Sequence, residues 1–234
     1  MSSYWIILLK MTFNEYFGDW KKVIDTEELN KVLKQINSLY SKSNCAPDYK
    51  NIFKVFTTTP YNSLKQIWLL QDPYPQKGIA TGLALANKIG TKKLSPSLEV
   101  IKESIINYEM PHNYINFVPD LEEWSKQGIL LLNTALTVEI NKPGSHSYIW
   151  REFIKKLLIN LSMYQPGLIY ILWGNSAKSF SSYINKNNHI YKRNHPSWYA
   201  RNNIKIPYNF FTQLNQKTKW LFGEEIMWYK EIKY

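Results

Sequence analysis

Residues 66–87 read QIWLLQDPYPQKGIATGLALAN, and the abrupt change within this stretch decides how the chain folds. The apolar run QIWLL stops at Gln71 and Asp72, two prolines then flank Tyr74, and small residues come next. The run has the length and composition of a buried strand. An Asp before a proline is typical of a turn when it is taken alone. The meaning of Asp72 therefore depends on the residues at the ends of the other apolar runs.

Three more segments, of which the first two are apolar runs, also lead into polar residues. GILLL leads into Asn133, GLIYILWG into Asn175 and HIYKRN into His195. Two helix-like segments, SLEVIKESIINY at 97–108 and IWREFIKKLLINLS at 149–162, separate the first three runs. This alternation predicts an α/β fold in a single domain, with a central, mainly parallel four-stranded sheet flanked by helices on both faces.

The carboxyl ends of parallel strands meet at one edge of a sheet, and ligands bind in the crevice beyond that edge. We therefore expect the residues at the ends of the four runs to converge on one site: Asp72, Asn133, Asn175 and His195. Singly, each has an ordinary explanation as a turn former, a loop cap or a surface residue. Together they supply a carboxylate, carboxamides and an imidazole, which can grip a planar polar ring and activate water.

The whole chain, residues 1–234, has the size and composition of one domain. With 234 residues, 44% of them hydrophobic, it can bury a substantial core. Residues 19–41 space apolar side chains at helical intervals and predict a helix capped by Thr26. Residues 1–10 either belong to the fold or form an N-terminal extension ahead of a second start at Met11.

The sequence favours a cytoplasmic protein that does not enter a membrane. The apolar run YWIILL near the start is far too short to span a bilayer, and no small-residue cleavage site comes after it. Cys45 is the single cysteine, which excludes an intrachain disulfide framework and fits a reducing compartment.

The charge of the chain favours a polyanionic partner. The formal net charge is +11, and no Asp or Glu lies between Glu152 and Glu224. Aromatic and polar residues interleave with the cations, as in HPSWYARNN, and a phosphate backbone could lie against such a face. A solvated lysine-rich surface is the alternative. The basic residues of this interval are Lys155, Lys156, Lys178, Lys186, Lys192, Arg193, Arg201, Lys205, Lys217 and Lys219.

Five motifs carry a resemblance to a known family. QDPYPQKGIATGLALAN resembles the water-activating motif of the uracil-DNA glycosylases of the large family found in bacteria, animals and herpesviruses. The order and spacing match from about Trp20 to the C-terminal region, so the resemblance implies the fold of this family. The other four motifs resemble its proline-serine loop, uracil-reading strand, phosphate turn and minor-groove loop: LSPSLEVIKESI, QGILLLNTALTV, ILWGNSAK and NHPSWYA.

The resemblance implies excision of uracil from DNA without a cofactor or metal ion. Asp72 would face the attacking water, and His195 would hydrogen-bond to O2 of the departing uracil. Asn133 would read the N3–H and O4 edge, while the ring of Tyr74 would collide with the C5 methyl of thymine and so exclude it. The implied uracil contacts are therefore Gln71, Tyr74, Leu85 and Asn133.

The resemblance also implies which residues handle DNA, the expected partner in single- or double-stranded form. Ser97, Asn175 and Ser197 would grip phosphates. Tyr199 lies where the family carries a wedge that fills the vacated stack, which offsets part of the few kcal/mol needed to extrude a base. We expect a monomer, with a proteinaceous DNA mimic as a candidate inhibitor.

Several departures from the family pattern keep a second function in view. Because an aromatic ring holds a base with about 1–3 kcal/mol of stacking, Leu85 should weaken uracil binding. The alternative is a DNA-binding or replication adaptor protein with weak or no catalysis. Retention of Asp72, Tyr74, Asn133 and His195 favours the enzyme. The departures are Leu70 for a glycine, Pro75 for a histidine, Leu85 for an aromatic, Asn175 for a serine and Trp198 for a proline.

Overall fold

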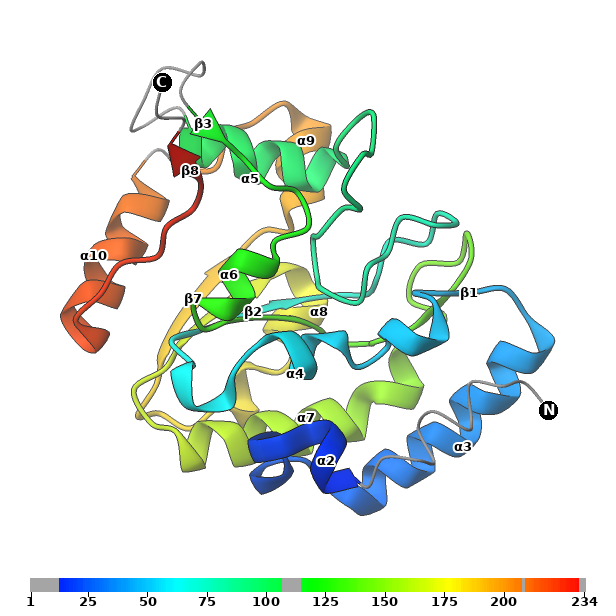
Figure 1. Ribbon diagram of the computed structural model, residues 1–234. Helices are drawn as coiled ribbons and strands as arrows, with labels where there is room; N and C mark the ends of the chain where they lie inside the picture. Colours follow the sequence, from blue (N-terminus) through cyan, green and yellow to red (C-terminus); the bar gives the residue numbers. More distant parts are fainter. Residues whose placement is uncertain (1–12, 107–114, 208, 232–234) are drawn as a thin grey trace.

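The centre of the molecule is a parallel sheet of four strands in the order β4-β2-β6-β7 (Figure 1). The computed structural model describes residues 13–106, 115–207 and 209–231, so the predicted extension at 1–10 lies outside the described residues. The strands are β2 (Gln66–Leu70), β4 (Ile129–Asn133), β6 (Ile169–Trp173) and β7 (His189–Arg193). All three neighbouring pairs are parallel, which confirms the predicted fold class.

Burial explains why three of these strands lack a polar face. Every residue of β2, β4 and β6 is buried, as expected when helices cover both faces of a parallel sheet. The outer strand β7 is only partly buried and carries Lys192 and Arg193. Charged residues on an edge strand discourage pairing with a second chain.

Helices cover the sheet on both sides (Figure 1). On one side, α7 (Ser147–Tyr164) packs against α3 (Thr26–Lys42). On the other side lie α5 (Pro96–Ile106) and α9 (Pro196–Asn202), which pack against each other, and α10 (Phe210–Phe222).

The ring of Trp68, in the middle of β2, joins the sheet to this second layer. Its centroid lies 5.8 Å from that of Trp173 on β6 and 5.9 Å from that of Phe211 on α10. Trp124 and Trp228 lie 5.6 and 5.9 Å from it. A buried aromatic cluster therefore supports the strands whose ends carry the predicted site residues.

The helix predicted at 19–41 begins later than expected. Residues Gly18–Lys22 form the 3-10 helix η1, and α3 starts at Thr26. The predicted cap Thr26 is wrong, because Asp25 has the extended backbone of an N-cap and its Oδ1 accepts a hydrogen bond from the Glu28 amide at 2.9 Å. Lys156 on α7 also pairs with Asp25 at 3.0 Å, which ties the start of α3 to the next helix.

The remaining elements are short. Two antiparallel pairs stand apart from the main sheet: β1 (Cys45–Ala46) with β5 (Val138–Glu139), and β3 (Ile115–Asn116) with β8 (Lys230–Glu231). No helix in the described ranges is long and apolar enough to cross a membrane. The other helices are α2 (Phe13–Phe17), η2 (Tyr49–Asn51), α4 (Lys54–Thr58), η3 (Tyr61–Ser63), α6 (Glu122–Lys126), α8 (Gly174–Lys178) and η5 (Ser181–Tyr183).

Candidate active site

A cavity of about 660 Å³ lies beyond the carboxyl ends of the strands. Asp72 reaches it from the segment after β2, Asn133 from the end of β4 and His195 from the segment after β7. Parallel pairing brings these segments to one edge of the sheet, as the sequence predicts. Five other predicted residues also line the cavity: Gln71, Tyr74, Leu85, Ser97 and Ser197.

The carboxyl group of Asp72 is largely buried and held from one side. The main-chain N–H of Gly144 donates a hydrogen bond to its Oδ2. Burial raises the pKa of Asp72 above its usual value, and the hydrogen bonds from Gly144 and the Gln71 side chain act in the opposite direction. A partly desolvated carboxylate fixed by a main-chain donor is suited to orient a water molecule.

Gly144 is a site residue that the sequence reasoning missed. It lies 72 residues from Asp72 in the chain, in the loop between β5 and α7. The Ser145 hydroxyl, which accepts a hydrogen bond from the Glu139 amide at 2.9 Å, helps to shape this loop. The dipeptide Pro143-Gly144 marks a turn in the sequence, but nothing local identifies its carboxylate partner.

The imidazole of His195 is held in one tautomer. Its Nδ1 accepts a hydrogen bond from the Ser197 amide at 3.2 Å and lies 2.9 Å from the Ser197 hydroxyl. An Nδ1 that accepts leaves the proton of the neutral ring on Nε2. Burial, and then the positive charge of Arg201, lower the pKa of His195 to about 4. The ring is therefore a neutral Nε2–H donor near pH 7.

Gly174 allows His195 to approach the end of β6. Its backbone has φ of +84°, and a Cβ atom there would lie only 3.0 Å from Cβ of His195. Asn175, the next residue, is exposed on α8 and does not line the cavity. The expectation that Asn175 converges with the other strand-end residues is thus wrong, because the chain turns at Gly174 before Asn175 can reach the site.

Hydrogen bonds from Thr134, the residue after Asn133, join the ends of β4 and β2. The Thr134 amide donates to the Leu70 carbonyl at 2.8 Å, and the Thr134 hydroxyl donates to the Gln71 carbonyl at 2.7 Å. Asn133 itself is only 6% exposed. Its carboxamide therefore has a fixed base from which it can present a donor and an acceptor to the cavity.

Tyr74 and Leu85 meet at one wall of the cavity. The Tyr74 hydroxyl donates to the Leu85 carbonyl at 3.1 Å and accepts from the Ser95 hydroxyl at 2.6 Å. Leu85 is buried and has φ of +67°, a conformation that is uncommon for a side chain of this size. Burial also raises the pKa of Tyr74 to about 12, so its hydroxyl stays protonated and can donate.

Tyr199 is not exposed as a wedge would require. Its side chain is 6% exposed and lies along a groove between α5 and α9. The neighbouring Trp198 is 37% exposed, and its ring stands edge-to-face on Tyr199 with centroids 5.2 Å apart. The structure thus corrects the expected position of the Tyr199 ring and leaves Trp198 as the exposed ring of the segment that carries His195.

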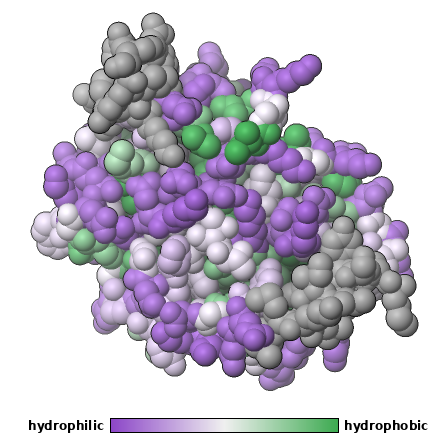
Figure 2. Space-filling model, viewed as in Figure 1, coloured by the Kyte–Doolittle hydropathy of each residue, from purple (hydrophilic) through white to green (hydrophobic). Residues whose placement is uncertain are grey.

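Several basic residues between Glu152 and Glu224, the interval without Asp or Glu, have no ion-pair partner among the described residues. Lys155, Lys156 and Lys219 form ion pairs with acidic residues. Hydrophilic side chains cover much of the face seen in Figure 2. No ion pair to any residue within the described ranges is formed by the rest of the set: Lys178, Lys186, Lys192, Arg193, Arg201, Lys205 and Lys217.

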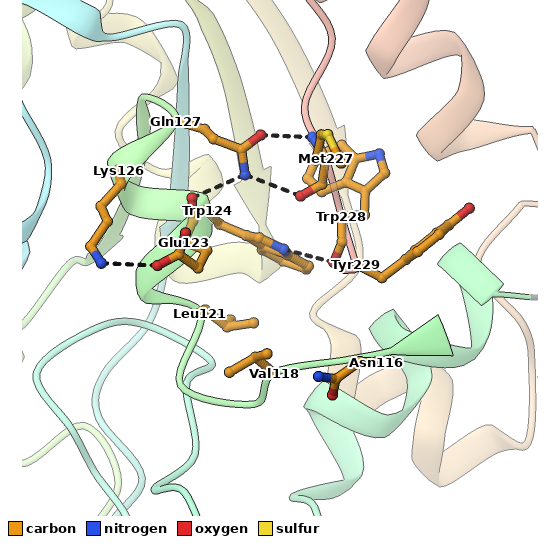
Figure 3. Close-up of a pocket in the computed structure, with 10 residues that line it drawn as sticks. All are labelled: Asn116, Val118, Leu121, Glu123, Trp124, Lys126, Gln127, Met227, Trp228 and Tyr229. Atoms are coloured by element: carbon orange, nitrogen blue, oxygen red, sulfur yellow. Dashed lines mark hydrogen bonds and ion pairs between the residues drawn. The ribbon is translucent and has the colours of Figure 1, made fainter. Parts of the chain in front are cut away.

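A second cavity, of about 390 Å³, lies between α6 and the segment that leads to β8 (Figure 3). The Gln127 side chain bonds to both main-chain groups of Met227, at 2.7 and 3.1 Å, and the Trp124 indole donates to the Trp228 carbonyl at 2.9 Å. No predicted site residue lines this cavity. Its polar contacts serve to attach the C-terminal segment. In the described ranges, no group of three or more His, Cys, Asp or Glu side chains could hold a metal ion.

Comparison with known proteins gives consistent matches. The family model of the uracil DNA glycosylase superfamily matches residues 54–219. A uracil-DNA glycosylase of Fusobacterium nucleatum is 35% identical over 224 residues, which cover 92% of this chain and 97% of that protein. One of Aliarcobacter butzleri is 34% identical over 215 residues, covering 89% and 99%.

Solved structures of low sequence identity share the fold. Mimivirus uracil-DNA glycosylase aligns with a TM-score of 0.70 at 22% identity and covers 93% of each chain. A Y322F variant of mimivirus UNG, solved in complex with UGI, aligns with a TM-score of 0.69 at 21% identity and covers 96% of this chain and 86% of that one.

Proposed function

The chain belongs to the uracil DNA glycosylase superfamily, and we propose that it hydrolyses the N-glycosidic bond of deoxyuridine in DNA, releasing uracil and leaving an abasic site. The observation that carries this proposal is the meeting of Asp72, Asn133 and His195 in one cavity, with His195 held as a neutral Nε2–H donor. These groups act on opposite sides of the bond that breaks.

Asp72 acts on the sugar side. Cleavage breaks the bond between C1′ and N1, and the electron pair leaves with uracil, so positive charge develops on the sugar. The ionised carboxylate orients a water molecule toward C1′ and stabilises that charge. The water oxygen forms the new bond to C1′, and its proton passes to the carboxylate. Gly144 fixes the carboxylate in the orientation that this step needs.

His195 and Asn133 act on the leaving group. The Nε2–H of His195 donates to O2 as negative charge develops there, and Asn133 bonds to the N3–H and O4 edge. A ring with a pKa of about 4 donates a hydrogen bond from its neutral form and needs no positive charge. Loss of one such fixed donor costs about a hundred- to a thousandfold in rate.

Tyr74 and Leu85 select the base. The ring of Tyr74 excludes a C5 methyl by its bulk, and Leu85 contacts the uracil face by dispersion. Gln71 and the buried Ser97 complete the lining from the segments after β2 and at the start of α5.

The unpaired cations attract the DNA backbone, and Trp198 replaces Tyr199 as the ring that fills the space left by the extruded base. Trp198 is the exposed ring on α9, and base stacking on an aromatic side chain is favourable for every base. Ser97 and Ser197 line the same cavity and are retained as phosphate contacts. Asn175, which is exposed on α8 and lies outside the cavity, is also retained as a phosphate contact.

We further propose that the chain acts as a cytoplasmic monomer and is a target for a protein inhibitor that mimics DNA. The complex of mimivirus UNG with UGI supports the last point. Inhibition of uracil release by added UGI, measured at increasing salt, tests it, since a DNA mimic must compete for the same cationic surface.

Alkali-labile cleavage of an oligonucleotide with a single uracil tests the proposed function directly. We expect cleavage by the wild-type protein and a loss of at least about a hundredfold in His195→Leu. His189→Leu is the matched control, because His189 begins β7, the strand that leads to His195, but does not line the cavity. Absence of cleavage in the folded wild-type protein, with binding to the oligonucleotide retained, would favour the adaptor function instead.

A further inference from the structure

The hydroxyl of Tyr74 joins three segments that surround the cavity. It belongs to the segment after β2, donates to the Leu85 carbonyl at 3.1 Å and accepts from the Ser95 hydroxyl at 2.6 Å. The Tyr74 hydroxyl has one proton, which it donates to the Leu85 carbonyl. The Ser95 hydroxyl is therefore the donor in its hydrogen bond with Tyr74. Both bonds must break if the end of the ring is to move.

Ser95 is itself fixed by buried groups. Its main-chain N–H donates to Oδ1 of Asn87 at 2.7 Å, and its carbonyl accepts from the Glu99 amide at 2.9 Å in the first turn of α5. Asn87 is fully buried, and its main-chain N–H donates to the Pro119 carbonyl at 2.8 Å. The Ser95 hydroxyl therefore reaches Tyr74 from a rigid support.

The side chain of Asn87 shows that this support has an energetic cost. Its Nδ2 is buried and has no hydrogen-bond partner among the described residues. A buried unsatisfied donor is unfavourable. An apolar side chain at this position would remove that cost but would leave the Ser95 amide without its acceptor. The polar side chain is thus explained by the need to hold Ser95.

Packing also restrains the Tyr74 ring. The ring packs against a small apolar cluster formed by Ala46, Ala80 and Val138, which lies apart from the main core. Exclusion by bulk works only if the excluding group cannot retreat when it is pressed. The contact with this cluster and the two hydrogen bonds at the hydroxyl together restrain the Tyr74 ring against a shift or a tilt.

We propose that Ser95 is a positioning residue that sets the size limit of the pyrimidine C5 substituent, by locking the Tyr74 ring against the cavity. The proposal rests on the proposed function, because it assigns the basis of selectivity at the same site. The side chain at position 85 takes no part in this lock, because the main-chain carbonyl of Leu85 accepts the hydrogen bond from Tyr74.

The test measures single-turnover release of uracil, 5-fluorouracil, 5-bromouracil and thymine from matched oligonucleotides. Each rate constant of a variant is divided by the wild-type value for the same base, which removes the effect of the substituent on leaving-group acidity. We expect Ser95→Ala to raise the thymine-to-uracil ratio by about tenfold or more, with bromouracil next and fluorouracil least affected. Ser95→Thr keeps the hydroxyl and should restore the wild-type order.

Ser104→Ala is the control for loss of a hydroxyl in the same part of the chain. Ser104 lies on α5, the helix that begins directly after Ser95, and its hydroxyl donates to the Val100 carbonyl at 2.7 Å, away from the cavity. Its removal should leave the ratio unchanged. A Ser95→Ala protein with wild-type ratios would overturn the proposal, as would an equal rise in Ser104→Ala. If the wild-type protein releases no uracil, the proposed function itself fails, which is a separate result.

Tyr74→Phe decides the question if Ser95→Ala does not fold. It removes the hydroxyl but keeps the ring, and we expect the same rise in the thymine-to-uracil ratio. The two changes break one lock, so the double variant should show little more than either single variant. Unchanged selectivity in Tyr74→Phe overturns the proposal, because bulk alone would then suffice.

Discussion

Replacement of Gly174 by alanine should displace His195 without changing its chemistry. Gly174 comes directly after β6 with φ of +84°, and an added Cβ would lie 3.0 Å from Cβ of His195 and 3.5 Å from its Cδ2. Two effects are expected from this one methyl group. The backbone conformation becomes unfavourable, and the imidazole is pushed away from its place in the cavity.

The size of each effect can be worked from the geometry. The left-handed conformation costs an ordinary residue roughly 1–2 kcal/mol, which lowers the melting temperature of a protein of this size by about 2–8 °C. A Cβ contact of 3.0 Å is shorter than ordinary carbon–carbon contact, so His195 must move by a few tenths of an ångström. Misplacement by about 1 Å can reduce a rate by about a hundredfold. For this smaller shift we expect single-turnover uracil release to fall by several-fold to about tenfold.

Gly167→Ala separates the two effects. Gly167 precedes the same strand with φ of +87°, and an added Cβ there would meet nothing within 4 Å. This variant should lose similar stability but keep the wild-type rate. The measurements are thermal unfolding and single-turnover release of uracil from one duplex oligonucleotide at saturating protein.

Equal rates in the two alanine variants would refute the assignment of Gly174 as the residue that makes room for His195. A second comparison uses the His195→Leu background, where the group to be displaced is already absent. There, Gly174→Ala should lower stability but should not slow the residual reaction further, because the two changes act on one group.

Three other predictions concern the site. Burial raises the pKa of Asp72, so the folded protein binds that proton more tightly than the unfolded chain, and stability falls as pH rises through the raised pKa. Asp72→Asn should therefore melt no lower than wild type at neutral pH, while it releases uracil at least about a hundredfold more slowly. A lower melting temperature would contradict the expected direction of the effect of Asp72 on stability. Trp198→Ala should slow release from duplex more than from single-stranded DNA, whereas Tyr199→Ala should chiefly lower thermal stability; the reverse pattern would restore Tyr199 as the wedge. Leu85→Phe should raise subsaturating uracil release several-fold if the pocket admits the ring, since about 1 kcal/mol corresponds to roughly fivefold, and a slower folded variant would show a pocket shaped for leucine.

The residues that the sequence located correctly share one property. Asp72, Asn133 and His195 each lie at or just after the carboxyl end of a strand, and strand ends in a parallel sheet meet wherever the sheet forms. Their convergence is therefore a consequence of the topology alone. Asn175 breaks the pattern because the chain turns at Gly174, one residue before it. The position of that turn cannot be read from the apolar run that precedes it.

The residues that were missed or misplaced depend on local direction or on distant partners. Consecutive residues of a helix differ by about 100° in direction, so a shift of one position exchanges a buried ring for an exposed one. That is the difference between Tyr199 and Trp198 on α9. Gly144 and Ser95 act through partners that are 72 and 21 residues away, and no short-range pattern connects them.

In the proposed mechanism, attraction of DNA and stabilisation of the uracil anion are separate electrostatic tasks. The unpaired lysines, such as Lys186 and Lys192, are exposed, and salt screens exposed charges beyond about 8–10 Å. They contribute to the encounter with a polyanion but act weakly on charge inside the cavity. His195 and Asn133 carry no net charge at neutral pH, yet they are held in a desolvated site where fixed dipoles act strongly. We therefore expect salt to affect the encounter with DNA, and cleavage of the glycosidic bond to depend on the buried donors and their supports.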